Sequence, residues 1–367
     1  MHARGASEDQ VARLRLIRSD NIGPVTYFQL LARFGSPQAA LDAVPDLAAR
    51  GGGRAPRLAS RPAVEQEMER VERLGARYLF LGQGLYPPLL AELEAAPPAL
   101  IVRGHQILLD KPAVALVGAR NASAAACRFA RQLAQDLGGA GMVVVSGLAR
   151  GIDTAAHDGA LETGTVAVVA GGIDIFYPPE NEERQAAIAE RGLLVAEQPP
   201  GVEPRARHFP YRNRIIAGLT HGTVVIEAAP KSGSLITARH ATEYGREVMA
   251  VPGSPLDPRA QGCNQLIREG ATLVQNADDV LEAIRPLRIR PFAQPGRDYA
   301  APPLMPDVEQ GERRAVLDLL SPTPVPVDEI VRQAGLSPAS VQTILLELEL
   351  AGRLERHAGG RVSLIAA

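Results

Sequence analysis

Six short apolar runs, each followed by a segment long enough for a helix, restrict the fold more than any other feature of the sequence. Their nearly continuous apolar character is typical of strands that are covered on both faces. Helices such as 123–137 and 234–245 fit between most of them. This alternation predicts an α/β fold with a doubly wound, mostly parallel sheet between residues 76 and 285. The runs are AVALV (113–117), MVVVS (142–146), TVAVVA (165–170), LLVAE (193–197), TVVIEA (223–228) and EVMAV (247–251).

Residues 1–75 read as a small helical domain. In NIGPVTYFQLLARFGS, Pro24 suits a first helical turn and Gly35 ends the helix. One face of this helix is predicted to carry Val25, Phe28, Leu31 and Phe34. The Gly-Pro entry resembles helix-hairpin-helix modules that grip DNA backbones, and a plain helical packing unit is the alternative. Residues 50–60 are expected to form a flexible surface loop.

The C-terminal part has the element order of a winged helix. A proline-rich linker over 286–309 separates a domain at 310–367, which contains VDEIVRQAG, a turn, ASVQTILLELELAG and a hairpin. The helix in the DNA-reading position carries Glu347 and Glu349 and has no basic residue before Arg353. Protein contact or regulation is therefore favoured over insertion into a DNA major groove.

The composition excludes several classes of protein. The formal charge is −2, so a uniformly basic surface is absent and a polyanion must meet a local patch. Such a patch is possible where Arg205, Arg207, His208, Arg212 and Arg214 gather, although arginine is abundant throughout the chain. No run of about 18 apolar residues occurs, which predicts a cytoplasmic protein without a membrane partner. The two cysteines support neither a disulfide framework nor a cysteine-rich metal site.

Three loops that follow predicted strands combine small residues, hydroxyls and a cation: 118–123, 146–153 and 231–237. In a parallel sheet these loops gather at the carboxyl ends of the strands, where backbone N–H groups and helix N-termini favour phosphate. Neither a dinucleotide nor a triphosphate motif is present, so no cofactor is predicted. The alternative is that the small residues only allow turns and cap the next helix.

The segment HFPYRNRIIAGL (208–219) places aromatic and basic side chains at the same edge. Phe209 can offer a ring on which a nucleic-acid base stacks, while Arg212 and Arg214 meet phosphates. The alternative packs the aromatic rings into the core and pairs the arginines with Glu197 or Glu227. We favour a functional role for Phe209 and a core position for Tyr211.

Convincing catalytic machinery is not found in the sequence. Asp153 and His157 lie four residues apart on a predicted helix and have the spacing to hydrogen-bond each other, but two such residues do not make a metal site. Asp153 is predicted to be an N-cap. A triad of Ser146, Asp153 and His157 is disfavoured, because all three come from one local segment without a nucleophile elbow.

At these residues the chain resembles the DprA (Smf) family of DNA-processing proteins. The resemblance rests on SGLARGIDTAAHDGAL (146–161), FPYRNRIIAGL (209–219), KSGSLITARHA (231–241), and VPGSP with GCNQLI (251–267). It implies a Rossmann-like core that binds single-stranded DNA, forms a homodimer and helps to load the RecA recombinase during natural transformation. The sequence departs from the family at Ala126-Cys127 and at Ala196. The candidate nucleic-acid-binding residues are Gly118, Arg120, Ser123, Ser146, Gly147, Arg150, Phe209, Arg212, Asn213, Arg214, Lys231, Ser232, Gly233 and Ser234.

Two other functions compete with a nonenzymatic DNA-binding mediator. The predicted fold is similar to that of nucleoside-monophosphate phosphoribohydrolases, and Glu227 lies after a strand as their glutamate does, but the P-G-G-x-G-T-x-x-E segment is absent. A transcription regulator acting through the tail is disfavoured by the acidic helix of the winged-helix segment.

Overall fold

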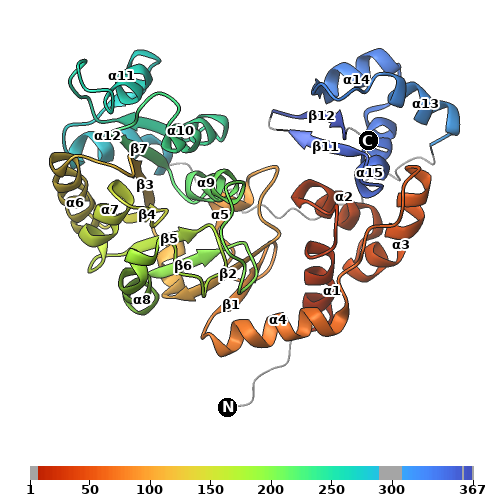
Figure 1. Ribbon diagram of the computed structural model, residues 1–367, viewed down its shortest axis with the longest axis horizontal. Coiled ribbons are helices and arrows are strands. Elements are labelled where there is room, and N and C mark those ends of the chain that lie inside the picture. Colours follow the sequence, from red (N-terminus) through yellow and green to blue (C-terminus); the bar gives the residue numbers. More distant parts are fainter. Residues whose placement is uncertain (1–6, 289–307, 358, 366–367) are drawn as a thin grey trace. The chain divides into compact units, whose positions relative to one another are not determined.

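The computed structural model describes residues 7–288, 308–357 and 359–365. The described chain divides into two compact units, one formed by residues 69–295 and the other by residues 1–68 together with 296–367 (Figure 1). Most of the predicted linker 286–309 lies outside the described residues, although its first three residues continue helix α12 (Ala277–Arg288). The predicted boundaries at 75/76 and 309/310 stay a prediction.

A nine-stranded sheet forms the centre of unit 69–295, in the order β1-β2-β6-β5-β4-β3-β7-β8-β9. The strands from β6 to β9 in this order are all parallel; the apolar runs predicted the first six of these seven strands, but not β9. The strands are β1 Arg77–Phe80, β2 Ala99–Gly104, β3 Ala113–Gly118, β4 Val143–Ser146, β5 Thr165–Val169, β6 Leu193–Ala196, β7 Gly222–Ile226, β8 Glu247–Ala250 and β9 Thr272–Leu273.

Two strands at one edge were not predicted. β1 pairs antiparallel with β2, and β2 pairs antiparallel with β6. Both are short segments, RYLF and ALIVRG, that precede the first apolar run of the predicted alternation between strands and helices. They extend the parallel sheet without a crossover helix.

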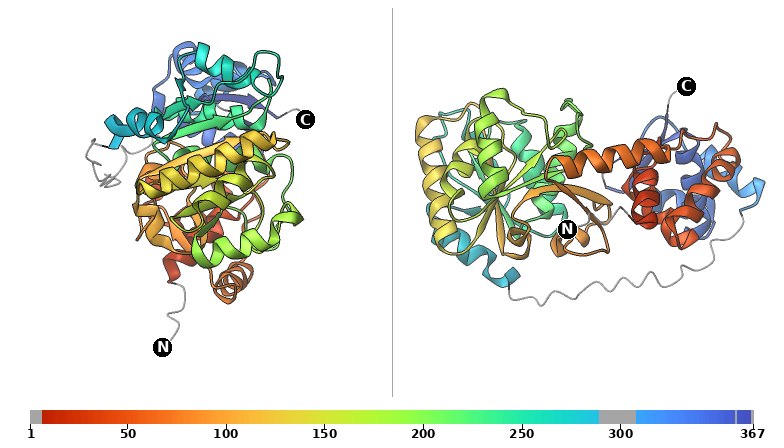
Figure 2. Two further views of the ribbon diagram at one scale, coloured as in Figure 1. Left: turned by 90° about the vertical axis from the view of Figure 1, so that its left-hand side faces the viewer. Right: turned by 90° about the horizontal axis from the view of Figure 1, so that it is seen from below.

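Helices cover both faces of this sheet (Figure 2). One apolar cluster packs α6, α7 and α12 against β3, β4 and β7. A second packs α5, α9, α10 and α11 against the opposite face of the same strands. The helices of this unit are α4 Arg61–Arg73, which enters it from the other unit, α5 Pro88–Ala91, α6 Ala124–Gly139, α7 Ile152–Ala160, α8 Glu182–Arg191, α9 His208–Gly218, α10 Gly233–Glu243, α11 Gln261–Arg268 and α12, with short 3-10 helices at Gln106–Asp110 and Pro179–Asn181.

The other unit combines N-terminal helices with a winged helix whose three short strands pair in the order β10-β12-β11. The predicted element order is confirmed. Its elements are α1 Glu8–Ile17, α2 Pro24–Phe34, α3 Pro37–Arg50, α13 Gln310–Asp318, β10 Val325–Pro326, α14 Val327–Ala334, α15 Pro338–Leu350, β11 Leu354–His357 and β12 Arg361–Leu364.

Helix α15 belongs to the core of the N-terminal helices as well as to that of the winged helix. Leu346 and Leu350 are fully buried in the cluster formed by α1, α2 and α3. Gly51, after α3, approaches α15 so closely that an added Cβ would lie 2.1 Å from the backbone oxygen of Glu347. The prediction of a flexible loop over 50–60 is therefore wrong at its start, where the chain is packed against α15.

The buried face of α2 also differs from the prediction. Tyr27, Leu30 and Leu31 are buried, whereas Phe28 and Phe34 only pack against the edge of this core. The Tyr27 ring is buried in this apolar cluster, and its hydroxyl accepts a hydrogen bond from Arg13 Nη1 at 3.1 Å, so the buried polar atom has a partner. Gly35 ends the helix with φ 73°, as predicted. Among the described residues, no helix has the length and apolar character needed to cross a membrane.

Candidate nucleic-acid interface

The carboxyl ends of the parallel strands lie along one edge of the sheet, which is the edge meant from here on. The three predicted loops lie there. After β3 the chain continues to β4, β5 and β6 on one side, and it returns with β7 on the other side of β3. Ligands of open α/β sheets bind beyond the carboxyl ends of strands at such a reversal. The loops after β3 and β4 are in contact, since the amide of Ile152 donates to the carbonyl of Ala119 at 3.3 Å.

Arg120 and Phe209 form a cation–aromatic pair at this edge. The guanidinium carbon of Arg120 lies 4.9 Å from the centroid of the Phe209 ring. Tyr177, from the loop after β5, contacts the same ring, with centroids 5.5 Å apart and planes tilted by 53°. Phe209 is half-buried, Arg120 is exposed and Tyr177 is 44% exposed. We call Arg120, Tyr177 and Phe209 the aromatic rim.

Arg212 lies one helical turn after Phe209 and is buried. Its Nη1 donates to the carbonyl of Val168 at 2.7 Å, and its Nε has no partner among the described residues. Gly147 makes room for it, because an added Cβ there would lie 1.7 Å from Nη1. Burial lowers the pKa of Arg212 to about 10, the charge of Asp153 opposes this shift, and Arg120 adds to it. Arg212 therefore stays positive at neutral pH.

Asp153 does not cap helix α7, which corrects the prediction. The cap position is Gly151, and Asp153 is the second residue of the helix. Its carboxylate accepts a hydrogen bond from the amide of Ala149 at 3.3 Å. Burial raises the pKa of Asp153, while the positive charge of Arg212 and hydrogen bonds from this loop lower it. The carboxylate holds the loop and balances the buried arginine.

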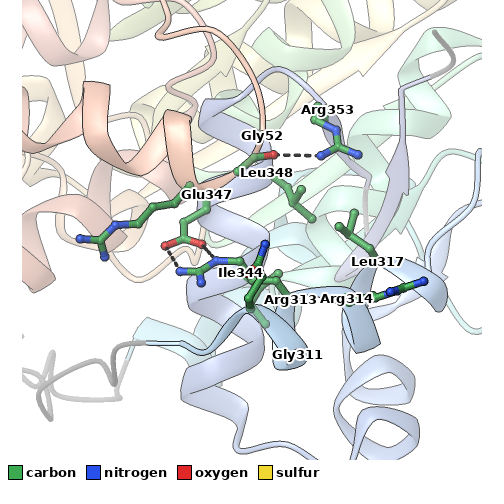
Figure 3. Close-up of a pocket in the computed structure, with 12 residues that line it drawn as sticks. Gly52, Gly311, Arg313, Arg314, Leu317, Ile344, Glu347, Leu348 and Arg353 are labelled. Carbon is green, nitrogen blue, oxygen red and sulfur yellow. Dashed lines mark hydrogen bonds and ion pairs between the residues drawn. The ribbon is translucent and has the colours of Figure 1, made fainter.

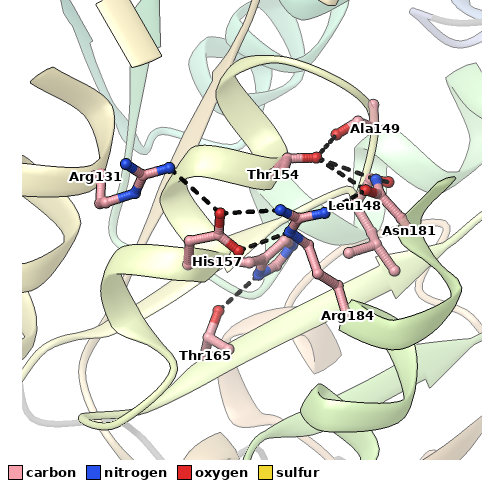
Figure 4. A network of polar contacts seen from close by, with 9 residues as sticks. Arg131, Leu148, Ala149, Thr154, His157, Thr165, Asn181 and Arg184 are labelled. Carbon is pink, nitrogen blue, oxygen red and sulfur yellow. Dashed lines mark hydrogen bonds and ion pairs between the residues drawn. The ribbon is translucent and has the colours of Figure 1, made fainter. Parts of the chain in front are cut away.

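A network of hydrogen bonds from Asn181 and Thr154 fixes the loop 148–154 (Figure 4). Asn181 donates from Nδ2 to the carbonyl of Leu148 at 2.9 Å, and Thr154 donates from Oγ1 to the carbonyl of Ala149 at 2.7 Å. Leu148 has a φ of 55°, a conformation that side-chain-bearing residues rarely adopt. These bonds keep the loop in a strained shape that turns its backbone toward the edge of the sheet.

The hydroxyls of Ser123 and Ser146 are both bonded within the protein, and contact of these residues with nucleic acid stays a prediction. Ser146 is fully buried, and its hydroxyl donates to the carbonyl of Leu116 at 2.6 Å. Ser123 caps α6, and its hydroxyl and amide both donate to the carboxylate of Glu227, at 2.6 and 2.8 Å. Gly118 ends β3, which pairs with β7 up to Ile226. These residues shape the first two loops.

Asn213 and Arg214 also make contacts within the protein, and their role in binding nucleic acid stays a prediction. The side-chain amide of Asn213 donates to the carbonyl of Gly233 at 3.1 Å, which ties α9 to the third loop. Arg214 is buried, donates to the carbonyl of Ala95 at 2.9 Å and forms an ion pair with Glu197. The alternative in which an arginine of this segment pairs with Glu197 therefore holds for Arg214.

The third loop presents its lysine to solvent. Lys231 is exposed and has a φ of 79°. Ser232 caps helix α10, and its hydroxyl lies 2.8 Å from that of Ser234, which is buried. Gly233 is exposed, with open space where a Cβ would be. On the second loop, Arg150 forms an exposed ion pair with Glu180.

Three aromatic residues near the rim were missed or misplaced by the sequence analysis. Tyr211 is 60% exposed, so its predicted core position is wrong. Phe176 and Tyr177 are 43% and 44% exposed and follow strand β5. The sequence carries a signal for them, because Phe176 and Tyr177 stand together before Pro178-Pro179 in the segment that follows the predicted strand 165–170.

The residues considered for catalysis are engaged elsewhere. His157 is buried, and its Nδ1 lies 2.7 Å from Thr165 Oγ1 instead of bonding to Asp153, as its spacing had suggested. Burial lowers the pKa of His157 to about 3. No cluster of metal-binding side chains occurs within the described ranges.

Comparison with known proteins assigns the whole arrangement to one family. The model of the family described as DNA recombination-mediator protein A matches residues 77–285. The chain belongs to this DprA family. Two further models match the flanks: the DprA-like N-terminal HHH domain over 7–69 and the DprA winged helix domain over 300–360.

Relatives span most of the chain. Protein Smf of Escherichia coli is 37% identical over 83% of this chain and 82% of its own length. DNA processing protein DprA of Streptococcus pneumoniae is 48% identical over 53% of this chain and 70% of its own length. An X-ray structure of the pneumococcal DprA superposes with a TM-score of 0.64 at 33% identity, covering 76% of this chain and 98% of that one.

A second solved relative bears on the ligand. A DprA structure from Helicobacter pylori, described as giving insight into a single-stranded DNA binding mode, superposes with a TM-score of 0.52 at 30% identity. It covers 57% of this chain and 95% of that one. The family, the Rossmann-like core, the helical N-terminal part and the winged helix that the resemblance implied are therefore confirmed.

Proposed function

We propose that the protein is a nonenzymatic mediator that binds single-stranded DNA at the aromatic rim and passes the strand to RecA in the cytoplasm. The observation that carries the proposal is the Arg120–Phe209 pair, with its 4.9 Å separation, next to the buried charge of Arg212. An aromatic face supports base stacking, and the arginines attract the phosphates on either side. The Helicobacter relative, whose structure is described in terms of a single-stranded DNA binding mode, supports the same ligand class.

The division of labour between the residues follows from their burial. Arg120, Phe209 and Lys231 reach solvent and are proposed to touch the strand. We propose that the loops and Arg212 are held in place by Gly147, Asp153 and Asn213. The buried Arg212 is proposed to contribute positive charge below the aromatic rim. Backbone N–H groups of the loops 118–123 and 146–153, other than those already bonded within the protein, are proposed to meet phosphate.

The test is binding of a labelled oligo-dT strand to the full chain, with a duplex of matched length as the control. Tight binding of the single strand and weak binding of the duplex are expected. Binding of the duplex with equal affinity would contradict the proposal. Dimerisation and RecA loading are tested separately, by sedimentation and by the rate at which RecA filaments form on the strand.

The hydrolase alternative loses its main support. Both carboxylate oxygens of Glu227 accept hydrogen bonds from Ser123, so this glutamate is committed to holding the first loop. We expect no free base when the protein is incubated with nucleoside monophosphates. Release of base that disappears in Glu227→Gln would revive that alternative.

A further inference from the structure

A second site lies in the unit formed by the N-terminal helices and the winged helix. A cavity of about 500 Å³ opens between the end of α3, helix α13 and helix α15 (Figure 3). Residues from both ends of the sequence line it, including Arg50, Arg314 and Arg353. It is a separate feature from the aromatic rim, because none of the rim residues lines it.

The walls of this cavity carry excess positive charge. Four arginines line it, and Glu347 is its single acidic residue. Arg313 neutralises that carboxylate, with Nε to Oε2 at 2.8 Å and Nη2 to Oε1 at 3.1 Å, and Glu347 is 1% exposed. Beyond this ion pair, the lining carries the charges of Arg314 and Arg353 and no second acidic side chain.

Two of these arginines are placed to receive a ligand. Arg353 is half-buried and donates from Nη1 to the carbonyl of Gly51 at 3.0 Å, which holds its guanidinium on the solvent side of the cavity, here called the mouth. Arg314 is exposed on α13 and has no hydrogen bond or ion pair among the described residues. A guanidinium group favours carboxylate or phosphate in a two-pronged contact.

The floor of the cavity is apolar. Leu317, Ile344 and Leu348 line it, and all three belong to the core of the winged helix or pack against it. The lining contains no aromatic residue. A ligand that fills the cavity must therefore combine an apolar group for the floor with negative charge for the mouth.

We propose that this arginine-rimmed cavity binds an acidic peptide segment of a partner protein, with an apolar side chain on the floor and carboxylates at the mouth. A peptide suits this lining better than single-stranded nucleic acid does. Single-stranded nucleic acid is held by stacking on aromatic rings, and the lining offers none. Helix α15 is also unable to enter a DNA groove with the face that carries Leu346 and Leu350, because that face is buried against the N-terminal helices.

The test uses the full chain and a short fluorescein-labelled peptide of aspartates with one central phenylalanine. Saturable binding that weakens as salt rises is expected. Arg314→Glu should weaken it roughly tenfold, because it replaces attraction by repulsion. Arg332→Glu is the matched control, since Arg332 is an exposed arginine of the same winged helix that does not line the cavity. It should leave the affinity unchanged.

A second peptide tests the floor without altering the protein. Replacing its phenylalanine by serine should weaken binding several-fold, because the apolar floor is then left unfilled. The proposal is overturned if the first peptide does not bind, or if Arg314→Glu and Arg332→Glu affect it equally. It is also overturned if Arg314→Glu weakens binding of an oligonucleotide but not of the peptide, which would assign the cavity to nucleic acid.

Discussion

The guanidinium of Arg120 lies over the ring of Phe209, with its central carbon 4.9 Å from the ring centroid. Arg120 lies in the loop after β3 and Phe209 in the first turn of α9, almost ninety positions apart in the sequence. Cation–aromatic contacts at exposed sites contribute about 0.5–1 kcal/mol, too little to explain why the chain brings them together for stability alone. Both groups are suited to an unpaired strand, the ring to a base and the guanidinium to a phosphate.

Replacing the ring should weaken binding of single-stranded DNA. For Phe209→Ala we expect roughly a fivefold to hundredfold loss of affinity for oligo-dT, which corresponds to about 1–3 kcal/mol of base stacking. Fluorescence anisotropy of a labelled strand measures it. Phe209→Tyr retains an aromatic face and should bind nearly as the wild type does. Equal losses in both variants would show that the ring does not act by stacking.

Removing the exposed cation should change the salt dependence of binding. For Arg120→Ala, the slope of log affinity against log salt should fall by about 0.7, the value for one phosphate contact on a single strand. Arg191→Ala is the control, because Arg191 ends helix α8 just before β6 begins, at the opposite edge of the sheet. An unchanged slope for Arg120→Ala would remove this arginine from the interface.

Stability should depend on pH through His157. Burial lowers its pKa to about 3, whereas in the unfolded chain the value is 6.5. Below pH 6.5 the unfolded chain gains a proton that the folded protein does not bind. The contribution of His157 is therefore complete above pH 6.5 and falls by about 1.4 kcal/mol per pH unit down toward pH 3.

His157→Gln isolates this effect. The variant keeps a polar side chain near Thr165 but has no ionisable ring, so its unfolding free energy should fall less steeply between pH 6.5 and 5. Chemical denaturation at a series of pH values measures both slopes. The comparison is needed because burial also lowers the pKa of His208, which adds to the slope in both proteins. Identical slopes would mean that His157 takes up its proton as readily in the folded protein as in the unfolded chain.

The N-terminal helices should depend on the winged helix for their stability. Leu350 is fully buried in their shared core, so Leu350→Ala is expected to cost about 2–5 kcal/mol. Hydrogen exchange should show faster exchange of amides in α1, α2 and α3, with the central sheet unaffected. Leu256→Ala, at a 92% exposed position, is the control. Unchanged exchange in α1 to α3 would show that the two parts fold separately.

Six of the seven parallel strands could be predicted from sequence because each is a nearly continuous apolar run, as in TVAVVA and TVVIEA, whereas the two-residue strand β9 has no such run. The edge strand β1 (Arg77–Phe80) lacks that signal, since Arg77 is exposed and only two of its residues are buried. The packing of α15 on the N-terminal helices is a contact over more than three hundred positions, which periodicity cannot report.

The candidate site was predictable in location but not in detail. Motif spacing placed Arg120, Phe209 and Arg212 at the same edge of the sheet, and the structure brings them together. Sequence alone did not distinguish side chains that face a ligand from those that hold the backbone. Ser146 and Arg214 have the same residue types as ligand-binding groups, but their partners, Leu116 and Glu197, are set by tertiary packing.

The most direct test of the central claim is photo-crosslinking of the full chain to an oligo-dT strand, followed by identification of the attached peptides. The account predicts crosslinks in the segments that contain Phe209 and Tyr177, and their loss when excess unlabelled single strand is added. Crosslinks confined to the winged-helix residues 310–364, with the rim segments unmodified, would contradict it.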